Sequence, residues 1–141
     1  MIVAQTERLL ISKFTVNDAA FFLELANTPS WIQYIGDRNL KTVEDAKKYL
    51  KKGTLKSYLE HGFGFYKLEI KETKEPIGTC GLVKRAELEN VDIGFALLPK
   101  YEGRGFGFES AEAVLMLAKD TFCLERVLAI TLPNNKNSIK L

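Results

Sequence analysis

The sequence predicts an α+β domain in an α/β/α arrangement, with helices on both faces of a mixed, mostly antiparallel central sheet. Five segments are predicted as strands: 7–14, 63–70, 77–84, 91–98 and 126–132. Apolar and polar residues alternate over the first two segments, while 91–98 is nearly all apolar, as expected of a central strand. Apolar residues at helical spacing separate the last two strands, so this pair is predicted to run parallel.

The composition is that of an ordinary soluble globular domain. The chain has 141 residues, 46% of them hydrophobic and 27% charged, with 20 basic against 18 acidic residues and a net charge of +2. Acids and bases are interleaved, which excludes the one-signed face of a nucleic-acid binder. No apolar run approaches the roughly 18 residues of a membrane span, and the N-terminus lacks a signal-peptide pattern. We expect a single cytoplasmic domain over residues 1–141, with no membrane contact.

The residues that commonly bind metals are few and scattered. Cys80 and Cys123 form no CxxC pair, and His61 is the single histidine, so no metal site is expected. Two free, buried thiols in a reducing cytosol are the simplest interpretation. His61 precedes Gly62 at a predicted helix end, where a cation is common, and a catalytic role is the alternative.

Two helices are predicted between the first and second strands. Capping boxes begin them at Thr15–Asp18 and Thr42–Asp45. Pro29 is expected to end the first helix, followed by a loop through Trp31 and Tyr34. Gly53 weakens the apolar stripe of the second helix at its middle.

A glycine-rich loop follows the fourth predicted strand and reads Tyr-Glu-Gly-Arg-Gly-Phe-Gly over residues 101–107. Three glycines at alternate positions let backbone N–H groups approach a large anion, and the helix that follows adds the positive end of its dipole. The spacing is neither the dinucleotide fingerprint nor a nucleoside-triphosphate loop. We predict a pyrophosphate site here, with a flexible turn as the alternative.

Several segments together resemble the GNAT superfamily of acetyltransferases, most closely the branch of the ribosomal-protein N-acetyltransferases. Residues 92–99 and 101–111 resemble its central motif, and Thr6–Ile11 resembles the opening strand of that branch. Residues 76–82 resemble its third strand, and 134–138 the start of its last cofactor-contacting motif. The resemblance covers essentially the whole chain, although Glu102 stands where the family pattern has Gln or Arg.

The resemblance implies an N-acetyltransferase that moves an acetyl group from acetyl-coenzyme A to a primary amine, on a protein N-terminus or a small molecule, by direct attack. Acetyl-coenzyme A is then the co-substrate and no metal is needed. Its pantetheine arm is expected in a splay between the fourth and fifth strands. The residues expected to hold this co-substrate are Phe95, Ala96, Leu97, Glu102, Gly103, Arg104, Gly105, Phe106, Gly107, Asn134 and Ser138.

Acetyl transfer to an amine needs a neutral amine, whereas an alkyl ammonium has a pKa of about 10.4. Asp92, at the start of the fourth strand, is the predicted base; the alternative is that it flanks the preceding turn. Main-chain N–H groups near 95–97 are expected to stabilise the developing oxyanion. Trp31 and Tyr34 are predicted to border the acceptor pocket, or else to cover the core.

Compared with the family, Leu141 falls about one turn into the expected last helix, which Asn137 and Ser138 would cap. Without the family's further strands, the apolar strand 126–132 is expected to be an exposed edge. We therefore predict a homodimer through that edge. The alternative function is a non-catalytic module that binds coenzyme A or another protein.

Overall fold

The computed structural model describes residues 2–34, 39–83, 91–122, 124, 126–131 and 135–140, and only the backbone of 30, 33, 34, 126–131 and 135–140. Within these ranges seven strands form one sheet, in the spatial order of the sequence. The strands are β1 (Ile2–Gln5), β2 (Leu9–Lys13), β3 (Phe65–Ile70), β4 (Pro76–Val83), β5 (Val91–Leu97), β6 (Arg126–Thr131) and β7 (Asn135–Lys140). Only β5 and β6 pair in parallel among them. The predicted fold class is confirmed.

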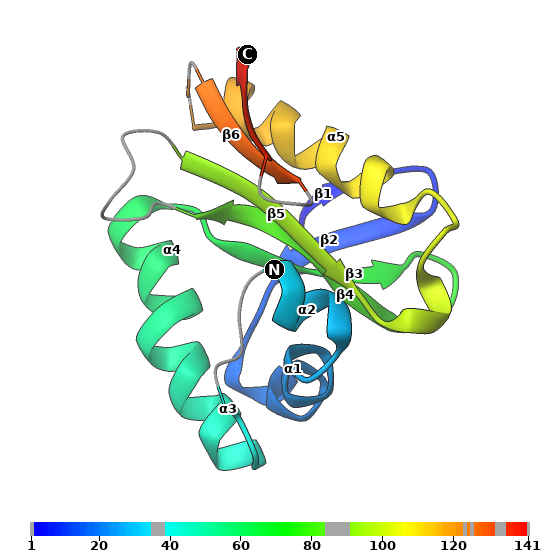
Figure 1. The fold of residues 1–141 in the computed structure, drawn as a ribbon, viewed down its shortest axis with the longest axis vertical. Coiled ribbons are helices and arrows are strands. Elements are labelled where there is room, and N and C mark those ends of the chain that lie inside the picture. Colours follow the sequence, from blue (N-terminus) through cyan, green and yellow to red (C-terminus); the bar gives the residue numbers. More distant parts are fainter. Residues whose placement is uncertain are drawn as a thin grey trace.

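Helices cover both faces of the sheet (Figure 1). One face carries α1 (Ala19–Ala26), α2 (Pro29–Tyr34), α3 (Val43–Tyr49) and α4 (Leu55–His61), and the other carries α5 (Phe106–Asp120). A π-helical segment, Leu50–Thr54, joins α3 to α4, so the two form one continuous helical stretch. Short 3-10 turns stand at Val16–Asp18 and Pro99–Tyr101. The mixed sheet is therefore sandwiched between helical layers, as the alternation of predicted elements requires.

Both predicted capping boxes are confirmed. The Thr42 hydroxyl accepts a hydrogen bond from the Asp45 N–H at 3.1 Å, and the Asp45 carboxylate accepts one from the Thr42 N–H at 3.2 Å. Thr15 and Asp18 make the same reciprocal pair at the start of the preceding helical segment. These bonds satisfy N–H groups that a helix leaves free at its N-terminus.

Two N-terminal elements differ from the prediction. Strand β1 was not predicted, and the predicted loop after Pro29 is wrong because residues 29–34 form α2. The Thr28 hydroxyl accepts from the Trp31 N–H at 3.2 Å and caps this helix. Proline is compatible with the first position of a helix because its missing N–H would have no helical partner there. Pro29 therefore ends one helix and begins the next.

The C-terminal segment corrects a second prediction. Residues 135–140 form β7, which runs antiparallel to β6 with Ser138 opposite Leu128, so Asn137 and Ser138 do not cap a helix. The edge of 126–132 that was expected to be exposed is therefore paired over Arg126–Thr131. The prediction of an exposed edge is wrong for this reason, because paired N–H and C=O groups offer no template. The homodimer stays a prediction without that support.

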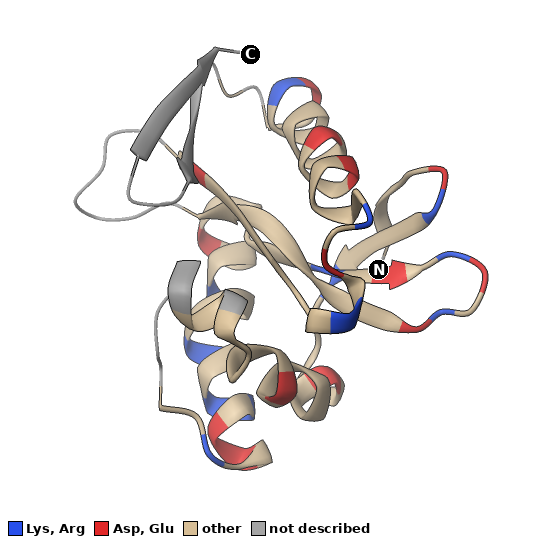
Figure 2. Ribbon diagram, turned by 45° about the vertical axis from the view of Figure 1, so that its right-hand side comes forward, with Lys and Arg blue, Asp and Glu red and all other residues tan. Residues whose placement is uncertain are grey.

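Charge is dispersed over the described chain. Figure 2 shows basic and acidic residues interspersed on the helices and turns, without a face of one sign. No helix among the described residues has the length and apolar character needed to cross a bilayer. In the same residues, no three His, Cys, Asp or Glu side chains lie together as potential metal ligands. Cys80 is a free, buried thiol, and Cys123 lies outside the described residues.

Candidate acetyl-coenzyme A and acceptor site

The parallel strands β5 and β6 pair over only part of their length. Their register covers Val91–Ile93 of β5, and beyond it β6 pairs with β7 alone. Residues 94–97 of β5 pair with β4, and the parallel register with β6 has ended before them. The two strands therefore separate after Ile93. This is the splay expected between the two strands, and it includes Phe95, Ala96 and Leu97.

The glycine loop after β5 adopts backbone conformations that only glycine takes readily. Gly103 and Gly105 have φ of +75° and +83°, and α5 begins immediately after Gly105. The first bond of the helix runs from the Glu109 N–H to the Gly105 carbonyl at 3.0 Å. Within the described chain, the N–H groups of Gly105, Phe106 and Gly107 donate to no acceptor. Free N–H groups at the positive end of a helix dipole form an anion site.

Gly107 brings this loop against the splayed strand. A Cβ at Gly107 would lie 2.6 Å from the ring of Phe95, so only glycine allows this contact. The Phe95 ring is thus packed on the first turn of α5, while the residue remains 40% exposed. The anion site and the splay are contiguous, and together they fit a diphosphate followed by an extended amide arm.

The two charged residues of the loop are exposed. Glu102 and Arg104 both lie on the surface, and the Glu102 N–H donates to the Pro99 carbonyl at 3.2 Å. The Arg104 guanidinium lies 5.9 Å from the centre of the Tyr101 ring. Arg104 therefore contributes a positive charge to the exposed surface of the loop that carries the free N–H groups.

Strand β5 presents its two faces to different helical layers. Phe95 faces α5 through its contact with Gly107. Asp92 is three residues earlier, so its side chain points to the opposite face, which carries α1 to α4. Val83 lies opposite Asp92 across the β4–β5 pair, and opposed residues share a face. Asp92 is buried, with 3% of its surface exposed.

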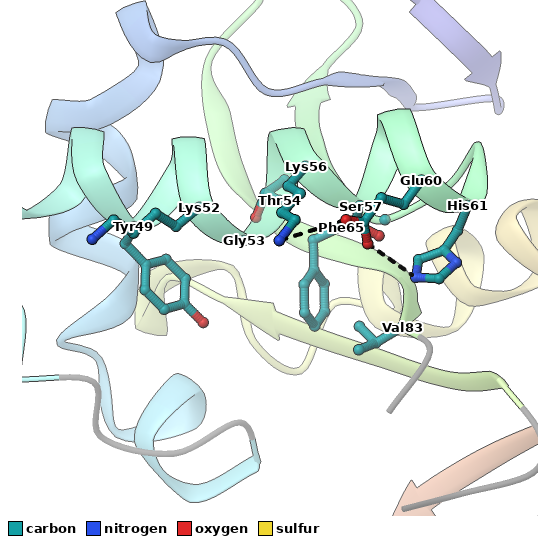
Figure 3. A pocket seen from close by; sticks show the side chains of 11 residues that line it. Tyr49, Lys52, Gly53, Thr54, Lys56, Ser57, Glu60, His61, Phe65 and Val83 are labelled. Atoms are coloured by element: carbon teal, nitrogen blue, oxygen red, sulfur yellow. Dashed lines mark ion pairs between the residues drawn. The ribbon is translucent and has the colours of Figure 1, made fainter. Parts of the chain in front are cut away.

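A cavity of about 320 Å³ opens beside Val83, on the same face as Asp92 (Figure 3). It lies between the α3–α4 stretch and the ends of β3 and β4. Its lining consists of Tyr49, Lys52, Gly53, Thr54, Lys56, Ser57, Glu60, His61, Gly64, Phe65 and Val83. We call it the α4 pocket.

The α4 pocket has an apolar floor and a charged rim. Figure 3 shows Phe65 and Val83 side by side beneath the helix. On the rim, Lys56 Nζ lies 3.5 Å from Glu60, whose other carboxylate oxygen lies 3.9 Å from His61 Nε2. His61 also ends α4 before the left-handed Gly62, as its predicted position at a helix end requires. Sequence reasoning missed this pocket, although Gly53 in the middle of an apolar stripe was a signal of an irregular helix.

Of the two residues predicted to border an acceptor pocket, Trp31 lies behind the α4 pocket. The Trp31 side chain is fully buried, edge-on to Phe22 with ring centres 5.1 Å apart and 5.9 Å from the ring of Phe65. Trp31 therefore supports the pocket floor through Phe65, and its burial favours the core-covering alternative. The Tyr34 side chain lies outside the description.

Ser138 and Asn134 were the two C-terminal residues expected to contact the co-substrate. Ser138 lies in β7 rather than in a helix, with only its backbone described. Asn134 lies outside the described residues.

Comparisons with known proteins agree with this geometry. Residues 8–141 match the family described as Acetyltransferase (GNAT) domain. A curated relative, "Uncharacterized N-acetyltransferase p20" of Bacillus licheniformis, is 30% identical over 138 residues, which cover 96% of this chain and 76% of that protein.

Solved structures share the fold. An acetyltransferase from Agrobacterium tumefaciens superposes with a TM-score of 0.76 at 22% identity, covering 92% of this chain and 74% of that one. The ribosomal L7/L12 alpha-N-protein acetyltransferase RimL, solved in complex with coenzyme A, superposes with a TM-score of 0.74 at 14% identity, covering 92% and 73%. With a family match over nearly all of its length, this chain belongs to the GNAT acetyltransferases and is an acyltransferase enzyme.

Proposed function

We propose that this chain transfers an acetyl group from acetyl-coenzyme A to a primary amine by direct attack of the amine on the thioester. One observation carries the proposal: the free N–H groups of Gly105, Phe106 and Gly107 stand at the start of α5, and Gly107 packs against Phe95 on the splayed part of β5. When the diphosphate of coenzyme A is bound at the loop, the attached pantetheine arm extends along β5. Within the family, this loop and this splay are the parts that a coenzyme A thioester needs.

The donor is held mainly by the backbone. The N–H groups at 105–107 bind the diphosphate, and Arg104 adds a positive charge nearby. The β5 backbone beyond Ile93, where the register with β6 has ended, bonds the amides of the arm. Main-chain N–H groups there also face the charge that develops on the thioester oxygen, and such fixed dipoles stabilise a transition state strongly.

The amine approaches from the other face of the sheet, through the α4 pocket. Asp92 and Val83 share this face, so a carboxylate lies on the acceptor side of the same strand that holds the donor. Asp92 takes the proton of the attacking ammonium, directly or through a water chain. Hydroxyl groups of Thr54 and Ser57 line the pocket and can orient the acceptor. The acceptor is either a protein N-terminus or a small molecule.

Direct attack is favoured over an acetyl-cysteine route by the environment of Cys80. This thiol is opposite Phe95 across β4–β5 and is fully buried. Burial raises the pKa of Cys80 to about 12, against which a weak hydrogen bond with Ser110 acts only partly. Because the thiolate is the nucleophilic form, a thiol with such a pKa attacks poorly at neutral pH.

A two-step experiment tests the proposal. Coenzyme A should raise the melting temperature, since a ligand of the native state must stabilise it. Thiol release from acetyl-coenzyme A should then follow on addition of an amine from a panel of peptides with free N-termini and small amines. A shift without thiol release for any amine would leave only the non-catalytic binding module. No shift at high coenzyme A concentration would contradict the proposal.

A further inference from the structure

We infer that Arg8 is a positioning residue that sets the direction of the diphosphate-binding N–H groups; this rests on the proposed function. Arg8 lies in the turn between β1 and β2, about a hundred positions before the glycine loop in the sequence. Its Nη1 donates to the carbonyl oxygen of Arg104 at 3.1 Å. Arg8 is thereby bound to the backbone of the loop itself.

The direction of one peptide group follows from that bond. The carbonyl of Arg104 and the N–H of Gly105 belong to the same planar, trans peptide unit, so they point in opposite directions. Because the carbonyl points to Arg8, the Gly105 N–H points away from Arg8. Gly105 has a φ of +83°, and its neighbours have no side-chain cap to hold this conformation. The hydrogen bond from Arg8 supplies that restraint.

The guanidinium is itself held by two other contacts. Its Nε donates to Glu109 Oε1 at 2.7 Å, and its centre lies 4.2 Å from the centre of the Phe106 ring. Its Nη2 lies 3.4 Å from where a Cβ of Gly105 would stand. The planar group therefore touches the backbone at Arg104, the ring of Phe106 and the first turn of α5 at once.

Glu109 connects the start of α5 to the β1–β2 turn through hydrogen bonds. Its second carboxylate oxygen accepts from the Arg8 N–H at 3.0 Å and from the Thr6 hydroxyl. Burial would raise the pKa of Glu109, but the hydrogen bonds from Thr6 and Arg8 outweigh it and hold that pKa below its usual value. The carboxylate stays ionised and engages the Arg8 charge, so the contribution of Arg8 to the diphosphate is one of geometry.

Lysine cannot replace this arginine. A single ammonium on a flexible stem cannot bond Glu109 and the Arg104 carbonyl while lying flat on Phe106, whereas the arginine fork has donors in fixed directions. Retaining the positive charge is therefore not enough to retain the loop geometry.

The test compares two acetyl donors in Arg8→Met and Arg8→Lys. Loss of a charge-assisted hydrogen bond corresponds to a coenzyme A Kd that rises by about tenfold or more, measured by calorimetry. The KM for acetyl-coenzyme A should rise equally, while kcat and the KM for S-acetylpantetheine, which lacks the diphosphate, stay within about twofold. Lys67→Met is the matched control, because it removes a comparable ion pair, with Asp18 at 2.9 Å, remote from the loop.

Three outcomes overturn the inference. An unchanged coenzyme A Kd in both Arg8 variants, with the wild type binding normally, refutes it and leaves the proposed function intact. An equal loss toward both donors means that Arg8 supports only the general fold. If the wild type binds no coenzyme A, the proposed function and this inference fail together. Should Arg8→Met not fold, Arg8→Lys carries the same comparison.

Discussion

At the scale of single residues, the three glycines of the loop have two different tasks. Gly103 and Gly105 supply left-handed backbone; a Cβ at Gly103 would meet open space, and one at Gly105 would meet only the Arg8 guanidinium, at an ordinary contact distance of 3.4 Å. Gly107 instead supplies space, because a side chain there would collide with Phe95. The sequence predicted that the loop approaches an anion, yet it could not separate these tasks, since both select the same residue type.

Replacing Gly105 by valine should weaken coenzyme A binding by tenfold or more. A left-handed backbone costs a non-glycine residue about 1–2 kcal/mol, and relief of that strain turns the N–H groups of the loop. Gly62→Val is the matched control, because Gly62 has the same φ of +83° and stands at the end of α4. Both variants should lose stability on denaturant unfolding, and only the Gly105 variant should lose affinity by calorimetry. Equal affinities would remove the loop from the site.

Asp92→Asn should lower kcat by about 10²- to 10⁴-fold, the usual contribution of a general base. The side chain lies on the face opposite the donor loop, so the coenzyme A Kd should stay unchanged. Steady-state rates with a fixed amine and calorimetry with coenzyme A check both parts. Activity within twofold of the wild type would favour the alternative that Asp92 only flanks a turn.

At the scale of elements, predictability followed the strength of the local signal. The alternating segment of β3 and the two capping boxes are determined by local sequence patterns, and they were predicted correctly. The segment Asn135–Lys140 is polar and has cap-like residues, and the free edge of β6 decides that it is a strand. Such tertiary pairing overrides local propensity. The α4 pocket could not be predicted from local sequence either, because its lining comes jointly from a helical stretch and two strands that are distant in the sequence.

The π-helical segment gives a prediction about one element. Gly53 has open space around it and no left-handed φ, so Gly53→Ala should stabilise the chain by about 0.5–1 kcal/mol through reduced backbone entropy of the unfolded state. Gly62→Ala also meets open space but has a φ of +83°, so it should destabilise. Denaturant midpoints of the two variants should move in opposite directions. A loss of stability in Gly53→Ala would show that the π turn itself needs glycine.

At the scale of the whole molecule, the β1–β2 turn and α5 are joined by one carboxylate. Arg8 of the turn and Glu109 of α5 form an ion pair at 2.7 Å. Segments that are far apart in the sequence are thereby held together at the site. This connection links global stability to the protonation of Glu109.

The free energy of unfolding should fall in acid through this group. The pKa of Glu109 lies below its ordinary value of 4.5 in the folded chain, so its contribution is present above pH 4.5 and is lost as the pH falls through the folded pKa. Glu109→Gln should show a smaller decrease in stability between pH 5 and pH 3 than the wild type, measured by denaturant unfolding at each pH. An identical decrease in both proteins would assign the acid sensitivity to other carboxyl groups.

The opposite orientation of Phe95 and Asp92 on β5 has a consequence for how acceptor specificity can change. Phe95 faces one helical layer and Asp92 the other, so under the proposed function the donor site and the acceptor site lie on opposite faces of the same strand. Substitutions along α3 and α4 can thus change which acceptor binds without weakening the binding of the thioester donor. Side-chain changes confined to one helical layer would then allow the same acetyl donor to be used with different amines.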